Sequence, residues 1–190
     1  MPIHFCLVVL VVTAWGCQPT AGSNSKRRNE ALRAELIALQ NQDLTEIAAI
    51  YADPQGAVDD PAPHLRRTQR LGQIVARYGW PTNALVGEDG ARAAWLIAQH
   101  ADEDPKFQRQ CLTLMEKAAR AGQADWTLVA CLTDRVLVAH GQSQRYGTQG
   151  NGGRAEEVPA IDARRKVLGL PTLEEYRQHL ASGGKTLCRP

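Results

Sequence analysis

The sequence of 190 residues lacks the short motifs by which many enzymes and metal proteins are recognised. It has no serine nucleophile elbow, no HExxH pair, no dinucleotide fingerprint and no phosphate-binding glycine loop, since Gly150–Gly153 is too irregular. The cysteines form no CxxC pair and no Cys/His spacing typical of zinc. The net charge of +2 is too near neutral to indicate nucleic-acid binding. We therefore predict no cofactor, no metal and no nucleic-acid partner.

The sequence also lacks an apolar run long enough to cross a membrane. The run from Ile3 to Trp15 is shorter than the ~20 residues that a spanning helix needs. It fits the apolar region of a secretory signal, which is ~7–15 residues long. Gly16 and Cys17 follow, which resembles the cleavage site of a bacterial lipoprotein, and the alternatives are an ordinary cleaved signal or an uncleaved anchor. Because Gln18 rather than Asp follows the cysteine, we expect the outer membrane rather than the inner.

These features predict a signal peptide over 1–16, a lipidated polar tether over 17–25 and a single helical domain over 26–190. The lipid would anchor the domain to the periplasmic face of the envelope through Cys17. Hydrophobic periodicity and capping residues predict an all-α bundle of six or seven helices, with a small irregular or β-hairpin insertion near 144–158. The expected helices span about 26–51, 63–78, 91–100, 105–121, 126–140, 162–168 and 172–182.

Three cysteines remain for the folded domain: Cys111, Cys131 and Cys188. At most one disulfide can form among them, which leaves one free thiol. Cys111 and Cys131 lie in apolar helical patterns, where a free cysteine behaves as a small hydrophobic residue. A bridge between Cys111 and Cys131 across neighbouring helices is one pairing that an oxidising compartment would permit, and the sequence alone does not decide among the pairings.

A first polar group lies between the third and fourth expected helices. His100, Asp102 and Asp104 alternate along the chain, and such a group can ligate a cation or act as a base with its orienting carboxylate. The simpler interpretation is that His100 ends one helix while Asp102 and Asp104 cap the next. The capping interpretation explains two of the three residues without any ligand, so we favour it.

Two further groups lie in and after the fifth expected helix. Asp134 and Arg135 are charged within its apolar pattern, which favours pairing inside the bundle, although Arg135 could also hold an anionic ligand. Gln144, Tyr146 and Gln149 follow in a loop rich in hydrogen-bonding groups. This loop could bind a ligand or simply pack Tyr146.

Several motifs, taken in order, resemble those of a bacterial family known as domain of unknown function 6624. They are Gly79-Trp80-Pro81-Thr82, Val86-Gly87, Gln99-His100-Ala101-Asp102, Asp104-Pro105 with Phe107-Gln108, Leu132-Thr133-Asp134-Arg135-Val136 and Tyr146-Gly147-Thr148-Gln149. The likeness covers about Leu32 to Tyr176. It implies a mostly helical domain, often exported, with no established activity. The family's early helix often carries Asp-Gln followed by Arg, whereas Asp43 here precedes Leu44, so we do not place this helix in the site.

The leading functional hypothesis is a non-enzymatic binding module, an envelope lipoprotein that holds a protein or another envelope ligand. One version is an immunity lipoprotein that neutralises a toxin from a rival bacterium. The alternative is a periplasmic hydrolase or metal-dependent enzyme with a site around His100, Asp102 and Asp104. Its substrate would be bound by Arg135, Tyr146 and Gln149.

Overall fold

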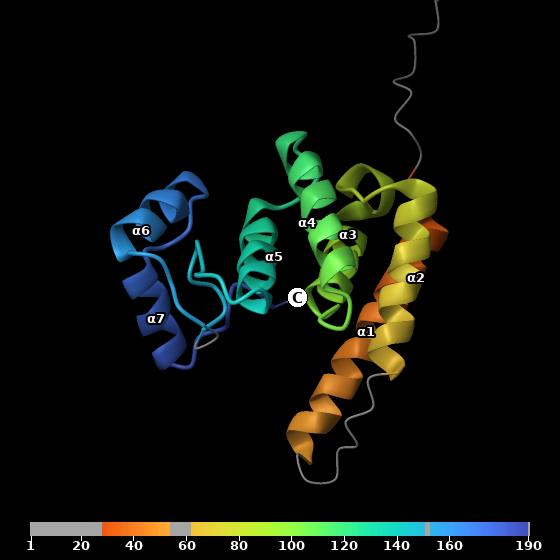
Figure 1. Ribbon diagram of the computed structural model, residues 1–190. Helices are drawn as coiled ribbons and strands as arrows, with labels where there is room; N and C mark the ends of the chain where they lie inside the picture. Colours follow the sequence, from red (N-terminus) through yellow and green to blue (C-terminus); the bar gives the residue numbers. More distant parts are fainter. Residues whose placement is uncertain (1–27, 54–61, 151–152, 190) are drawn as a thin grey trace, which may run out of the picture.

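Seven helices form the part of the chain that the computed structural model describes, which is residues 28–53, 62–150 and 153–189 (Figure 1). They are α1 (Glu30–Ala52), α2 (Ala62–Tyr78), α3 (Asn83–Gln99), α4 (Pro105–Arg120), α5 (Trp126–Ala139), α6 (Val158–Val167) and α7 (Leu173–Ala181). Within these residues no strand occurs, and a single bridge joins Gln144 to Ala155. The all-α class is confirmed, and the insertion near 144–158 is irregular rather than a hairpin.

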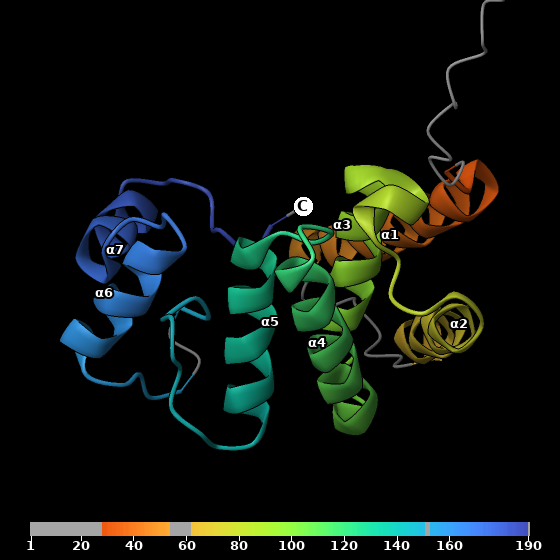
Figure 2. The same ribbon diagram turned by 90° about the horizontal axis from the view of Figure 1, so that it is seen from above.

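Helix α3 lies at the centre of the bundle, where it contacts α1, α2, α4 and α5 (Figures 1 and 2). Its residues from Ala93 to Gln99 are all buried. Small side chains such as Gly90, Ala94 and Ala98 let the neighbouring helices approach closely. The buried Trp95 donates its indole N–H to the Leu128 carbonyl of α5 at 2.9 Å. The bundle is therefore built around an almost fully buried central helix.

This central helix begins earlier than the sequence predicts. Thr82 is its N-cap, and the helix runs from Asn83 through Gly87, where a φ of 77° produces a kink. The helix expected over about 91–100 was therefore predicted to start too late, because residues 88–90 are already helical. Glycine adopts a positive φ without steric cost, so the chain bends at Gly87 and continues as helix.

Most helix starts follow the predicted caps. The side chains of Asp104, Asp125 and Thr172 each accept a hydrogen bond from a backbone N–H in the first turn of the following helix. At Thr172 the expected capping box is complete. Helix α6 differs, because it begins at Val158 instead of Asp162 and has no side-chain cap.

Helices α6 and α7 pair with each other beside α5 (Figure 2). They bury Ile161, Leu173 and Tyr176, none of which belongs to the main core formed by α1 to α5. The irregular segment after α5 crosses between these two parts and packs closely on α7, since a Cβ at Gly147 would lie 2.6 Å from Leu173. We call α6, α7 and this segment, residues 141–189, the C-terminal unit.

A disulfide attaches the end of the C-terminal unit to α5. It joins Cys131 to Cys188, while Cys111 is a buried free thiol. The suggested pairing of Cys111 with Cys131 is therefore wrong. Cys111 is enclosed in the main core, whereas the Cys188 sulfur lies 3.7 Å from the carbonyl of Thr148, in the loop beside α5.

None of the described helices is both long and apolar enough to cross a membrane. The predicted signal peptide, the tether and Cys17 fall outside the described residues. That residues 26–190 form one domain stays a prediction.

Candidate functional site

A buried carboxylate on α1 forms the centre of the candidate site. Asp43 continues the buried face that carries Leu32 and Leu36, and only 1% of its surface is exposed. A carboxylate in such a position is stable only when charged or hydrogen-bonded groups surround it. This helix was not expected in the site because Leu44 departs from the family pattern, yet it supplies the central group.

His100 is the first partner of this carboxylate. It caps the C-terminus of α3, and its Nδ1 lies 2.6 Å from Oδ2 of Asp43. Because an ionised carboxylate only accepts hydrogen bonds, Nδ1 carries a proton in this contact. Nε2 has no hydrogen-bond partner within the described part of the chain, and the side chain is 26% exposed. His100 therefore presents a basic nitrogen held in a fixed orientation.

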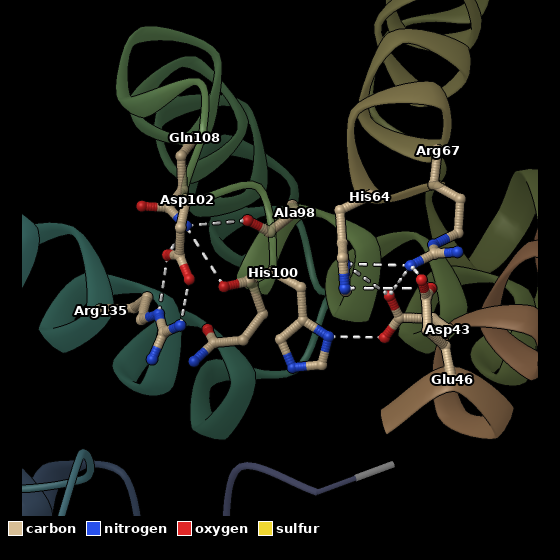
Figure 3. A network of polar contacts seen from close by, with 10 residues as sticks. Asp43, Glu46, His64, Arg67, Ala98, His100, Asp102, Gln108 and Arg135 are labelled. Atoms are coloured by element: carbon tan, nitrogen blue, oxygen red, sulfur yellow. Dashed lines mark hydrogen bonds and ion pairs between the residues drawn. The ribbon is translucent and has the colours of Figure 1, made fainter. Parts of the chain in front are cut away.

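Helix α2 brings two further groups to the same carboxylate (Figure 3). Arg67 Nη2 lies 3.0 Å from Oδ1 of Asp43 and 2.5 Å from Oε2 of Glu46. The same nitrogen lies 3.0 Å from Nδ1 of His64. His64 Nδ1 in turn lies 3.4 Å from Oδ1 of Asp43. Two imidazoles and one guanidinium thus surround a single buried carboxylate. We call Asp43, Glu46, His64, Arg67 and His100 the Asp43 cluster.

These neighbours decide the ionisation of Asp43. Burial alone raises the pKa of Asp43, but the hydrogen bond from His100 and the charges of His100, Arg67 and His64 lower it by more. The net result is a pKa below the usual aspartate value. Asp43 is therefore an anion at neutral pH.

Asp102 and Arg135 form an ion pair on the other side of His100 (Figure 3). Arg135 donates from Nε at 2.9 Å and also from Nη2. The buried Gln108 bonds the carbonyls of Ala98 and Gln99 through Nε2, at 3.2 and 3.3 Å. These contacts join α3, α4 and α5 around the turn that carries His100.

The three residues of the first predicted polar group, His100, Asp102 and Asp104, therefore have three different roles. His100 belongs to the Asp43 cluster and Asp102 pairs with Arg135. Asp104 caps α4 by accepting from the Phe107 N–H at 3.0 Å. The capping interpretation is correct for Asp104 and wrong for Asp102.

Asp134 stabilises a loop. Its carboxylate is fully buried and accepts hydrogen bonds from the backbone N–H groups of Arg145, Tyr146 and Thr148, at 2.7, 3.1 and 2.9 Å. The Thr148 hydroxyl donates a fourth bond at 2.9 Å. Three backbone N–H groups and one hydroxyl thus compensate the buried charge of Asp134.

The predicted loop residues belong to this same loop. The side-chain oxygen of Gln144 accepts from the Gln149 N–H at 2.9 Å, and Gln149 Nε2 donates to the Cys131 carbonyl at 3.1 Å. The carbonyl of Tyr146 accepts from Arg165 at 2.7 Å. The bond to Cys131 holds the C-terminal unit against α5, while the other two bonds lie within that unit, and none of the three involves the Asp43 cluster.

The sequence interpretation missed Asp43, Glu46, His64 and Arg67. The available signal was a charged residue on an apolar helical face. Asp43 lies on the buried stripe of α1, and Arg67 lies beside Leu71 on the buried face of α2.

Among the described residues, no three His, Cys, Asp or Glu side chains are arranged to hold a metal ion.

The comparisons with known proteins agree with the motif resemblance. No curated protein and no solved structure matches the chain. A family model described as a family of unknown function (DUF6624) matches residues 34–185, which include every residue of the Asp43 cluster. The chain belongs to this family of unknown function.

Proposed function

We propose that this protein is a hydrolase in which His100 is the general base and Asp43 orients it. The observation that carries the proposal is the 2.6 Å contact between Nδ1 of His100 and the buried carboxylate, with Nε2 unpaired in the described residues. In such a pair the carboxylate fixes the tautomer and stabilises the imidazolium that forms.

The reaction begins when Nε2 of His100 removes a proton from a water molecule. The water oxygen attacks the electrophilic centre of the substrate, and the bond to the leaving group breaks. General-base catalysis by a positioned imidazole accelerates such a step by ~10²–10⁴-fold. The leading hypothesis from the sequence, a binding module without catalysis, does not require a partly exposed imidazole held by a buried carboxylate.

The test measures hydrolysis of p-nitrophenyl butyrate and of bis-p-nitrophenyl phosphate by the full-length protein. We expect His100→Gln and Asp43→Asn to lose ~100-fold or more of the rate. The matched control is His140→Gln, because His140 caps the C-terminus of α5 as His100 caps α3. The proposal is wrong if His100→Gln and His140→Gln have equal rates.

We also propose that the protein is exported and anchored by lipid on Cys17, at the periplasmic face of the outer membrane. The apolar leader supports this, and so does the disulfide between Cys131 and Cys188, because disulfides persist in oxidising compartments. Mass spectrometry of the mature N-terminus should find acylated Cys17, and Cys17→Ala should abolish the acylated form. An intact Met1 in cytosolic material would contradict the proposal.

A second candidate function is the binding of a protein partner, of which an immunity lipoprotein against a toxin is one version. The observation in its favour is the exposed apolar C-terminal end of α1, where Tyr51 is 78% and Ile50 40% exposed. Partner capture from envelope extracts should fall with Tyr51→Arg. Val167→Arg is the matched control, because Val167 is 83% exposed on the C-terminal unit.

A further inference from the structure

The Asp43 cluster contains a second imidazole that the reaction above does not use. His64 lies in the first turn of α2, with Nδ1 3.4 Å from Oδ1 of Asp43 and Nε2 3.9 Å from Oε2 of Glu46. His100 occupies the other oxygen of the same carboxylate. Figure 3 shows both rings facing Asp43. Two proton-carrying groups therefore lie at one site.

The charges of the cluster favour one proton on the pair of imidazoles. Asp43 and Glu46 are both in contact with Arg67, which compensates only one of the two negative charges. A proton on one imidazole compensates the other. The neutral imidazole then serves as a base and the protonated one as an acid.

The surroundings of the two rings differ, and this assigns the roles. His100 contacts the carboxylate alone, with Nε2 unpaired in the described residues, which suits a base. His64 has two carboxylates within 4 Å and the Arg67 guanidinium 3.0 Å from Nδ1. Two carboxylates and one guanidinium therefore surround His64, whereas a single carboxylate contacts His100.

The geometry points to His64 as the general acid of the proposed hydrolase, and to a neutral carboxylic ester of an alcohol as its substrate. This inference rests on the proposed function. An alcohol leaves readily only when its oxygen is protonated, so an acid beside the base fits this substrate. A neutral ester also fits because Arg67 and Arg135 are both paired with carboxylates. Their guanidinium groups are therefore already engaged, and a phosphate anion would have to displace a carboxylate to bind them.

The reaction balances with water as the only co-reactant. His100 Nε2 takes one proton from water, and the water oxygen forms a bond to the carbonyl carbon. The bond between that carbon and the alcohol oxygen then breaks, and His64 gives its proton to the leaving oxygen. The products are the acid and the alcohol, and the proton on His100 returns to His64 through solvent.

The test compares two esters with the same acyl group, p-nitrophenyl butyrate and ethyl butyrate, using the full-length protein. p-Nitrophenolate leaves as a stable anion, whereas the ethyl leaving group needs a proton. We expect His64→Gln to slow hydrolysis of the ethyl ester by ~100-fold or more and of the p-nitrophenyl ester by roughly threefold at most. His100→Gln should slow both, and His140→Gln neither.

The pH profile gives a second readout. With ethyl butyrate the wild-type rate should fall at low pH, as the base is protonated, and at high pH, as the acid loses its proton. His64→Gln should lose the fall at high pH. His64→Asn serves as the second variant if thermal unfolding shows that His64→Gln does not fold.

The outcomes separate this inference from the proposed function. Suppose that His100→Gln slows hydrolysis of both esters, while His64→Gln slows both equally or slows neither. The acid role of His64 is then wrong, and the role of His100 as general base still holds. If the wild-type protein hydrolyses neither carboxylic ester, the assigned substrate class is wrong. If His100→Gln leaves unchanged every rate that the wild-type protein shows, with bis-p-nitrophenyl phosphate included, both proposals are overturned.

Discussion

Asp43 makes the free energy of unfolding of the protein depend on pH in the acidic range. Its pKa is lower in the folded protein than the ordinary aspartate value, so its stabilising contribution is complete above that ordinary value. The contribution is lost as the pH falls through the lowered pKa. We predict that Asp43→Ala lowers the free energy of unfolding by about 3 kcal/mol at pH 7, because it leaves buried partners uncompensated.

Urea unfolding at pH 7, 5, 4 and 3 checks this prediction. The difference between wild type and Asp43→Ala should shrink towards pH 3. Asp104→Asn is the control, because asparagine keeps the N-cap of α4. A difference that stays constant over the whole range would show that folding does not lower the pKa of Asp43.

The free thiol of Cys111 should be unreactive. Burial raises the pKa of Cys111 to about 12, and only the thiolate reacts with alkylating agents. We predict that iodoacetamide at pH 8 leaves Cys111 unmodified in the native protein and modifies it in urea. Peptide mass spectrometry measures both, and modification of the native protein would place Cys111 outside the core.

At the residue scale the sequence identified His100 but not the groups that surround it. His100 and Asp43 are separated by 57 positions in the chain, and only the packing of α1 on α3 brings them together. Local patterns carry no information about such a contact. A carboxylate on the apolar stripe of α1 was the one local sign that a polar site lies there.

At the scale of elements, Asp134 determines the path of the chain after α5. Replacing it with alanine leaves three backbone N–H groups and the Thr148 hydroxyl without their acceptor. We predict that Asp134→Ala destabilises the protein by about 3 kcal/mol or more, with faster hydrogen exchange in residues 144–149. Asp125→Ala, which removes the N-cap of the same helix, should cost ~1 kcal/mol and leave that loop unchanged.

The helix caps were predictable because their signals are local. Asp104 and Thr172 act within one turn of their own helix. The start of α3 was not predictable from the same rules, because Gly87 bends the helix where a glycine normally suggests its end. The role of Asp134 was also hidden, since its partners lie 11 to 14 residues along the chain.

At the scale of the whole molecule, two parts meet at α5. The main bundle is built around α3, and the C-terminal unit has its own small core. Inside that unit the fully buried Arg165 donates to the carbonyls of Tyr146 and Pro171, at 2.7 and 2.5 Å, and lies 4.9 Å from the ring centroid of Tyr176. Burial lowers the pKa of Arg165. The all-α class followed from periodicity, but this division depends on contacts that no local pattern contains.

The two parts should respond differently to loss of the disulfide. The bridge between Cys131 and Cys188 spans 57 residues, and closing a loop of that length contributes about 4 kcal/mol in the chain-entropy account. We predict that Cys131→Ser with Cys188→Ser increases hydrogen exchange in α6, α7 and residues 182–189. Protection in α1 to α4, whose core does not depend on the bridge, should stay near the wild-type level. Cys111→Ser is the control for substitution of a buried cysteine and should leave exchange in α6 and α7 unchanged. Equal loss of protection in α3 and α7 would mean that the two parts unfold as one unit.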